Sequence, residues 1–165
     1  MIKIGILSDT HGNFSGDVCE FLSDADEIWH AGDIGNIGVA DEIAALKPLR
    51  AVYGNIDGEE VRRHYPRFLH FACEGVEVLM THIGGYPQHY HSEVRTLLQQ
   101  HRPQLFVCGH SHILRVMYDK KLQMLCINPG AAGHYGFHQV RTAIRLRIHN
   151  GNISDLEVGE WKRKA

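Results

Sequence analysis

Residues 30–36 read His30-Ala31-Gly32-Asp33-Ile34-Gly35-Asn36, so that one carboxylate stands among glycines directly after the apolar pair Ile28-Trp29. This order is typical of a buried strand that ends in a tight loop and presents Asp33 at the edge of a sheet. Other polar clusters along the chain are Asp9-Thr10-His11, Gly54-Asn55, Thr81-His82 and Gly109-His110-Ser111-His112. We interpret Asp33 as a bridge between two metal ions and these clusters as the source of further ligands.

Length and composition are those of a globular protein. The chain has 165 residues, of which 44% are hydrophobic and 22% are charged, so we expect one domain over residues 1–165. A formal net charge of -2 gives no reason to expect a nucleic acid or a membrane as partner. The only basic run, Lys162-Arg163-Lys164, is expected to be a solvated tail.

Cysteine usage indicates a reducing compartment. Cys19, Cys73, Cys108 and Cys126 form no CxxC pair, so neither a disulfide framework nor a cysteine zinc site is predicted. We therefore expect reduced thiols in a cytoplasmic protein. No apolar run is long enough to be a signal peptide or to span a bilayer.

The first half of the chain alternates between strand and helix patterns. Strands are expected at residues 2–8, 27–31 and 49–53, with a helix capped by Asn13 or Ser15 and another helix at residues 39–46 between them. A nucleotide-binding doubly wound sheet is the competing interpretation of this half. The first strand is followed by Ser8-Asp9-Thr10-His11-Gly12, however, and not by a phosphate-binding GxGxxG loop.

The second half is richer in strands. A hairpin is expected at residues 68–73 and 76–80, after a short helix at 59–64, and a strand at 104–108 follows a helix near 93–100. The remaining strands, around residues 116–118, 124–127, 142–148 and 153–158, are expected to be antiparallel. The chain is thus expected to form two sheets with flanking helices.

The polar clusters suit divalent metals. In Asp9–His11 and His110–His112, alternate residues of an extended segment place both side chains on one side, where they can clamp an ion. Asp33, Asn55 and His82 follow separate strands, at intervals that return the chain to the same rim of a sheet. Six or seven ligands on one rim imply two metal ions.

These motifs, in this order, resemble those of the calcineurin-like metallophosphoesterase superfamily, whose pattern is DxH, GDxx, GNH(D/E), H and GHxH. The matching segments are Asp9-Thr10-His11, Gly32-Asp33-Ile34-Gly35, Gly54-Asn55-Ile56-Asp57, His82 and Gly109-His110-Ser111-His112. The short length and the Asn128-Pro129-Gly130 turn are similar to the small single-domain phosphodiesterases of that superfamily. The resemblance implies an α/β fold, a four-layer α-β-β-α sandwich of two mixed sheets with flanking helices.

The resemblance also implies site roles. One divalent ion would be held by Asp9, His11 and His112, the other by Asn55, His82 and His110, with Asp33 as the bridge. Asp33, Asn55 and Asp57 are the predicted catalytic residues, and the ions would be manganese, zinc, iron, nickel or cobalt. The family histidine that assists the leaving group is replaced by Ile56, while Asp57 matches the acidic position.

Two ions about 3.5–4 Å apart can share a hydroxide that attacks phosphorus in line. Because only Asp9 and Asp33 are charged among the ligands, the site would stay positive and favour an anionic phosphoester. We therefore expect a phosphodiesterase acting on a small molecule. The alternatives are a phosphomonoesterase, a protein-binding scaffold like the retromer subunit of the superfamily, and a nuclease, which the missing basic stripe disfavours.

The remaining histidines divide into two groups. Those expected to be structural or exposed are His30, His64, His70, His101 and His149. Those in or near loops that could overhang the site are His89, His91, His134 and His138. Arg115 and Arg141 are further candidates for phosphate contacts.

Overall fold

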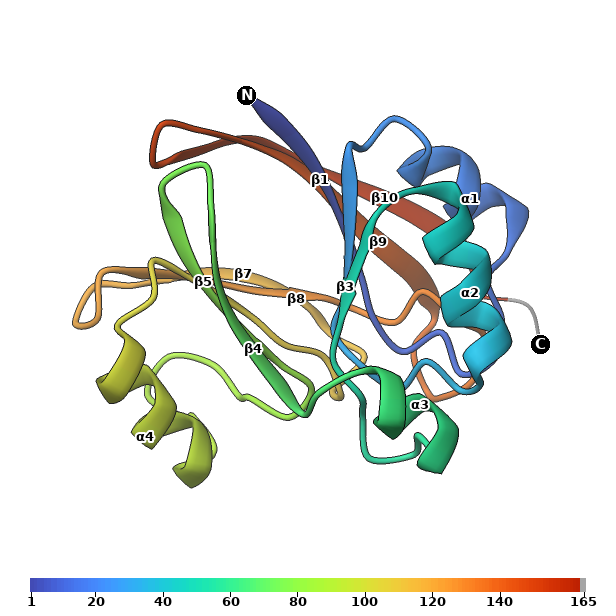
Figure 1. Cartoon of the computed structure of the whole chain (residues 1–165), viewed down its shortest axis with the longest axis horizontal. Helices are drawn as coiled ribbons and strands as arrows, with labels where there is room; N and C mark the ends of the chain where they lie inside the picture. Colours follow the sequence, from blue (N-terminus) through green and yellow to red (C-terminus); the bar gives the residue numbers. More distant parts are fainter. Residues whose placement is uncertain (164–165) are drawn as a thin grey trace.

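Two five-stranded mixed sheets lie between layers of helices (Figure 1). The computed structural model describes residues 1–163. Its strands are β1 (Ile2–Leu7), β2 (Glu27–His30), β3 (Leu49–Ala51), β4 (Phe68–Cys73), β5 (Val76–Thr81), β6 (Leu105–Val107), β7 (Leu114–Asp119), β8 (Met124–Pro129), β9 (Val140–His149) and β10 (Asn152–Lys162). Its helices are α1 (Gly16–Leu22), α2 (Ile37–Leu46), α3 (Glu59–His64) and α4 (Ser92–His101).

The first sheet has the strand order β10-β9-β1-β2-β3, in which β1, β2 and β3 are parallel. Side chains alternate between the two faces of a strand. Ile4 and Ile6 of β1 accordingly pack in the core between the sheets, whereas Leu7 packs in the cluster under α1 and α2. Burial of both faces explains the almost continuous apolar character of β1.

The second sheet has the order β4-β5-β6-β8-β7. Val78 and Met80 of β5 join the core between the sheets, and Leu79 packs with Val94 and Leu98 of α4 on the outer face. The molecule therefore has four layers, with α1 and α2 outside one sheet and α4 outside the other (Figure 1). The expected α-β-β-α sandwich of two mixed sheets is confirmed.

The pairing of the later strands differs from the expectation of antiparallel strands throughout. β8 lies between β6 and β7, and it is parallel to β6 but antiparallel to β7. β9 pairs with β1 and brings β10 with it, so the end of the chain completes the first sheet. β3 stops at Ala51, because the Tyr53 amide donates to the Pro66 carbonyl (2.9 Å) and leaves the sheet.

Of the expected solvated tail, Lys162 is exposed although it lies in a strand, and Arg163 is half-buried. Lys162 belongs to β10, and the Arg163 guanidinium donates to the carbonyl oxygens of His134 and Gly136. Lys164 lies outside the described residues. The four cysteines are free, as predicted. Within residues 1–163, no helix has the length and apolarity needed to cross a bilayer.

Parallel strands place their carboxyl ends at the same edge of a sheet, and this positions the polar clusters. The loops after β1, β2 and β3 meet the loops after β5 and β6 at one edge of the sandwich. Asn36 ends the loop after β2 and caps α2, since its side-chain oxygen accepts from the Val39 amide (3.0 Å).

Candidate metal centre

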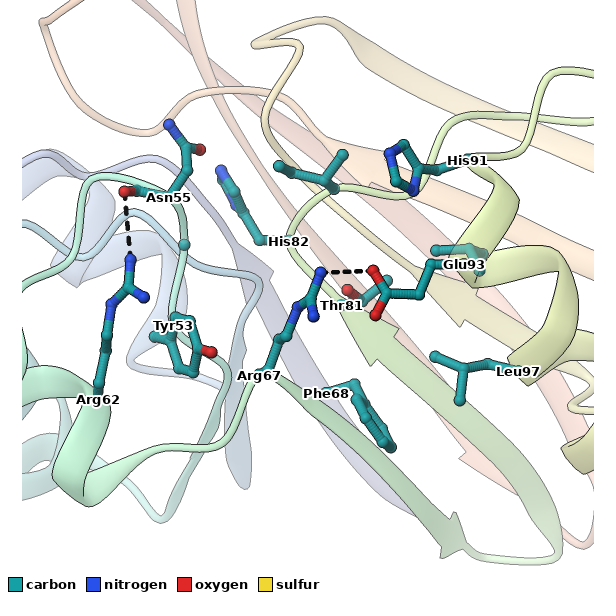
Figure 2. A pocket seen from close by; sticks show the side chains of 13 residues that line it. Tyr53, Asn55, Arg62, Arg67, Phe68, Thr81, His82, His91, Glu93 and Leu97 are labelled. Carbon is teal, nitrogen blue, oxygen red and sulfur yellow. Dashed lines mark hydrogen bonds and ion pairs between the residues drawn. The ribbon is translucent and has the colours of Figure 1, made fainter.

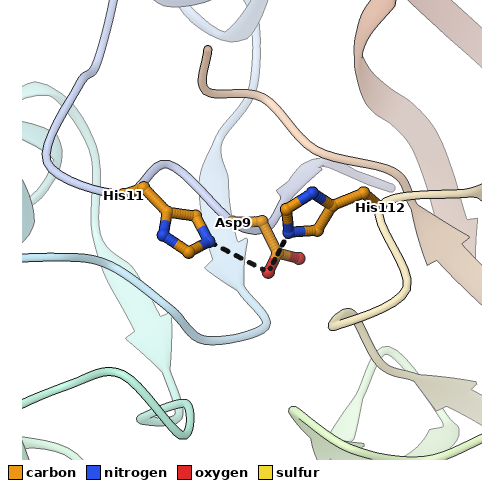
Figure 3. A group of neighbouring side chains, drawn as sticks. All are labelled: Asp9, His11 and His112. Atoms are coloured by element: carbon orange, nitrogen blue, oxygen red, sulfur yellow. Dashed lines mark ion pairs between the residues drawn. The ribbon is translucent and has the colours of Figure 1, made fainter. Parts of the chain in front are cut away.

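The first group of ligand-type side chains consists of Asp9, His11 and His112, whose ligand atoms all lie within 4.8 Å of one another (Figure 3). Asp9 is fully buried. Its Oδ1 atom lies 3.2 Å from His112 Nε2 and 3.7 Å from His11 Nε2. Two loops from different sheets, after β1 and after β6, therefore supply one three-ligand cluster.

The second group consists of Asp33, His82 and His110, again within 4.8 Å. Asp33 Oδ2 lies 3.2 Å from His82 Nε2. Asn55 joins this group, because its Oδ1 atom lies 3.1 Å from His110 Nδ1. The structure thus brings all seven predicted metal ligands together in two neighbouring clusters.

Asp33 lies where the two clusters meet. Its Oδ2 atom is 3.2 Å from His82 Nε2 of the second group and 3.5 Å from His11 Nε2 of the first. His82 Nε2 is in turn 3.8 Å from Asp9 Oδ1. A carboxylate in this position can contact two ions at once, as the sequence predicts for Asp33.

Three ligand atoms are buried and have no hydrogen-bond partner among the described residues: Asp9 Oδ1, His11 Nε2 and His82 Nε2. In Asp9 and His82, the other polar atom of the side chain is hydrogen-bonded. Asp9 Oδ2 accepts from Ser8 Oγ (2.6 Å) and from the His110 amide (3.1 Å), and His82 Nδ1 donates to the Ala31 carbonyl (2.7 Å). An unpaired buried polar atom costs about 1–3 kcal/mol. Outer atoms that are fixed and inner atoms that converge unpaired fit a metal centre.

The electrostatics of the clusters favour a cation. Burial raises the pKa of Asp9, but the imidazoles of His11 and His112 outweigh it and hold this pKa well below its usual range. Burial lowers the pKa of His82, but the carboxylates of Asp33 and Asp9 outweigh it and raise this pKa. Bound cations would satisfy the same carboxylates without protonated imidazoles.

Five of the seven ligands have left-handed backbone conformations. They are Asp9 (φ 54°), His11 (φ 47°), Asp33 (φ 56°), His110 (φ 73°) and His112 (φ 62°). Such conformations cost about 1–3 kcal/mol per residue and persist where the surrounding structure imposes them, which is typical of functional sites. The strain is concentrated on the residues with ligand chemistry.

Asp57 ties two of the loops together. It is 3% exposed, and its carboxylate accepts from the amides of Ile34 (3.1 Å), Gly35 (2.8 Å) and Gly54 (2.8 Å). These bonds hold the loop after β2 against the loop after β3. The Asp57 carboxylate, which the sequence predicts to be catalytic, therefore accepts hydrogen bonds from three backbone amides.

Two positioning residues have no signal in the sequence that connects them to the site. Asn128 Nδ2 donates to the Gly109 carbonyl and to Ser111 Oγ (both 3.0 Å), which fixes the loop that carries His110. Ser8 holds Asp9 through the bond given above. In the sequence Asn128 has the features of an ordinary turn residue, because its partners lie far away along the chain.

His30 is structural, as expected. It is fully buried, its Nδ1 accepts from the Gly32 amide (3.1 Å), and its Nε2 lies 3.0 Å from Thr10 Oγ1. Because Thr10 Oγ1 donates to the Ile34 carbonyl, His30 is the donor in their bond and is neutral. Burial lowers the pKa of His30 to about 4.

The two arginines that are candidates for phosphate contacts lie in different environments. Arg141 is 2% exposed and pairs with Asp17 (2.6 Å), so its assignment to phosphate is wrong. Arg115 lies over the Tyr86 ring (3.8 Å to the centroid) and lines a cavity beside His110. Among the loop histidines, His91 lines cavities near the site and His138 packs on His112 (5.1 Å between centroids).

The fold recurs in proteins of known structure. Vps29 from Chaetomium thermophilum is 13% identical, with a TM-score of 0.75 over 99% of this chain and 100% of that chain. Vps29 from Entamoeba histolytica in complex with Zn²⁺ is also 13% identical, with a TM-score of 0.75 over 99% of this chain and 100% of that chain. A novel archaeal phosphodiesterase is 23% identical, with a TM-score of 0.75 over 95% of this chain and 99% of that chain.

At these identities the solved structures share the fold alone. No curated protein sequence matches the chain. The family model of the calcineurin-like phosphoesterase superfamily domain matches residues 2–151, a segment that includes every ligand of both clusters. The chain therefore belongs to the calcineurin-like phosphoesterase superfamily.

Proposed function

We propose that the chain is a metal-dependent phosphodiesterase that hydrolyses a small phosphodiester. The observation that supports it most is the pair of clusters in which three buried ligand atoms converge without hydrogen-bond partners. The Entamoeba Vps29 structure with Zn²⁺ supports a metal in this fold. Four free thiols support a cytoplasmic location.

The ligand assignment follows the clusters. Asp9, His11 and His112 would hold one ion, Asn55, His82 and His110 the other, and Asp33 would contact both. Two divalent ions, for which manganese, zinc, iron, nickel and cobalt are candidates, supply an activated water at neutral pH and polarise a phosphoryl oxygen. Since Asp9 and Asp33 are the only charged ligands, an anionic phosphoester would be attracted.

The space around the second cluster supports a diester over a monoester. A cavity of about 380 Å³ adjoins Asn55 and His82, and a second cavity of about 240 Å³ adjoins His110. A phosphodiester carries two substituents, and two cavities beside one cluster offer room for both. In this proposal Asp57 positions the loops and does not touch the substrate.

The proposal is tested by metal content and turnover of the same protein. Elemental analysis after saturation with manganese should give two ions per chain. Asp33→Asn should weaken both sites, whereas His11→Ala should mainly weaken one, because only Asp33 lies between both clusters. At most one ion in the saturated wild type would contradict the two-metal site.

Turnover separates the related functions. The loaded protein should hydrolyse bis(4-nitrophenyl) phosphate with a kcat/KM at least equal to that for 4-nitrophenyl phosphate. A strong preference for the monoester would replace the proposal by a phosphomonoesterase. No hydrolysis of either ester by protein with two bound ions would favour a protein-binding scaffold.

A further inference from the structure

We infer that the cavity beside Asn55 and His82 is a subsite for a planar aromatic substituent of the substrate, an inference that rests on the proposed phosphodiesterase function. The cavity holds about 380 Å³, which lies within the usual range for small-molecule sites. Asn55 and His82 belong to the second ligand cluster and also line the cavity. A group bound in the cavity is therefore next to any phosphate held at that cluster.

The wall away from the ligands is apolar. Phe68 begins the edge strand β4, and Leu97 comes from α4 (Figure 2). Val94 of α4 also lines this wall. Phe68 is 42% exposed and belongs to none of the three core clusters. A half-exposed phenylalanine in a cavity wall can stack against a ligand, and the contact buries apolar surface of its ring.

The charged groups of the cavity already have partners. Figure 2 shows the Arg67–Glu93 ion pair between the ligand end of the cavity and the Phe68–Leu97 end. Arg62 donates to the Asp57 carbonyl (2.7 Å) and the Asn55 carbonyl (3.4 Å) and lies over the Tyr53 ring (4.5 Å to the centroid).

This pairing decides between two kinds of substituent. A second phosphate would need a guanidinium that is available to it, yet Arg67 is neutralised by Glu93 and Arg62 is held by backbone carbonyls. An uncharged ring needs only apolar or planar groups to pack against, and the Phe68 ring and the Arg67 guanidinium are such groups. The cavity therefore selects an aromatic alcohol in ester linkage over a substituent with its own phosphate.

Binding of two stable phosphinates to manganese-loaded protein tests the inference. Diphenylphosphinate and diethylphosphinate carry the same charge and cannot be hydrolysed at their carbon–phosphorus bonds, so calorimetry reports binding without turnover. We expect the diphenyl compound to bind roughly tenfold more tightly to the wild type. Phe68→Ala should remove most of this preference, because it weakens the binding of diphenylphosphinate much more than that of diethylphosphinate.

Two further variants complete the test. Phe68→Leu keeps apolar bulk but loses the ring and should lose much of the preference, so a fully retained preference would overturn the aromatic assignment. Tyr118→Ala, which removes an exposed aromatic side chain of β7 outside the cavity, should leave both Kd values unchanged. Equal binding of the two phosphinates to the wild type would also overturn the inference.

The outcomes remain distinct from those of the proposed function. Hydrolysis of bis(4-nitrophenyl) phosphate with no aromatic preference in the phosphinate titrations would leave the phosphodiesterase proposal standing and remove the subsite. An aromatic preference without hydrolysis of any diester would keep the ring site and remove the proposed function on which its role as an ester subsite rests.

Discussion

At the scale of single residues, position 56 separates this chain from the family pattern. Ile56 contributes only backbone to the centre, because its amide donates to Asp33 Oδ1 (3.1 Å) while its side chain is 46% exposed. An aliphatic side chain cannot deliver a proton to a leaving group. In the proposed phosphodiesterase reaction Ile56 would therefore not protonate the leaving group, although its amide still supports Asp33.

The first prediction concerns leaving groups. Without a proton donor the leaving oxygen departs as an anion, so kcat should fall steeply across diesters of rising leaving-group pKa. General acid catalysis is typically worth ~10²–10⁴-fold, and Ile56→His should restore part of this for poor leaving groups while good ones change little. The measurement is kcat against leaving-group pKa at fixed metal content. A shallow dependence in the wild type would mean that another group already supplies the proton.

At the scale of elements, two loops depend on Gly54 and Asp57, neither of which is a predicted metal ligand. The loops after β2 and β3 are joined by the three backbone bonds to Asp57 and by close packing at Gly54. A Cβ atom on Gly54 would lie 2.0 Å from Asp33 Oδ1, so a glycine is needed for Asp33 to reach its position. The predicted metal ligands are placed by loop-to-loop contacts as much as by strand ends.

The second prediction is that Asp57→Ala destabilises the fold and the metal centre together. The buried amides of Ile34 and Gly54 would lose their acceptor at about 1–3 kcal/mol each, and the more exposed Gly35 amide would bond to water, so the free energy of unfolding should fall by about 3 kcal/mol. Metal affinity should fall ~10–100-fold, as for other groups that orient ligands. Urea denaturation and metal titration measure both, with Asp41→Ala on the exposed face of α2 as the matched control.

A catalytic Asp57 would behave differently. If this carboxylate transferred protons, its removal would abolish one limb of the pH profile of kcat/KM even at saturating metal. A positioning role leaves the shape of that profile unchanged, and excess metal should restore turnover.

The third prediction uses two neighbouring glycines. Gly54→Ala should reduce metal affinity by more than tenfold, because the new methyl group displaces the Asp33 carboxylate. Gly58→Ala is the control, since nothing lies within 4 Å of its Cβ position. Competition with a chelating dye measures both variants. Equal affinities would show that the loop can shift without loss of the site.

The sequence predicts what is encoded locally. Asp9, Asp33 and His82 follow buried apolar strands, and hydrophobic runs with glycine-rich ends reveal such strands directly. The partnership of β9 with β1 and the bond from Asn128 to Gly109 join parts of the chain that are far apart in sequence. No local pattern specifies these long-range pairings, so they appear only in the folded structure.

At the scale of the whole molecule, acid should unfold the metal-free protein partly through His30, whose bonds to Thr10 and Gly32 join the loops after β1 and β2. The pKa of His30 is lowered from 6.5 to about 4 by burial. Between these values the unfolded chain binds a proton that the folded chain does not, so stability falls as the pH falls through this window.

The fourth prediction is that His30 alone removes about 2 kcal/mol of unfolding free energy between pH 7 and pH 5. The pKa values of His110 and His138 are also lowered by burial and add to the slope, whereas the raised pKa of His82 opposes it around pH 6.5, where the unfolded chain is only partly protonated at this residue. The signal is therefore the difference between wild type and His30→Gln, which stays neutral and can still donate and accept. Urea denaturation of chelator-treated protein measures the unfolding free energy at the two pH values. The loss between pH 7 and pH 5 should be about 2 kcal/mol smaller in the variant than in the wild type, even if the variant is less stable at pH 7. Parallel pH dependences would mean that His30 keeps its proton equilibrium on folding, and its two bonds would then have to be reinterpreted with a charged imidazole.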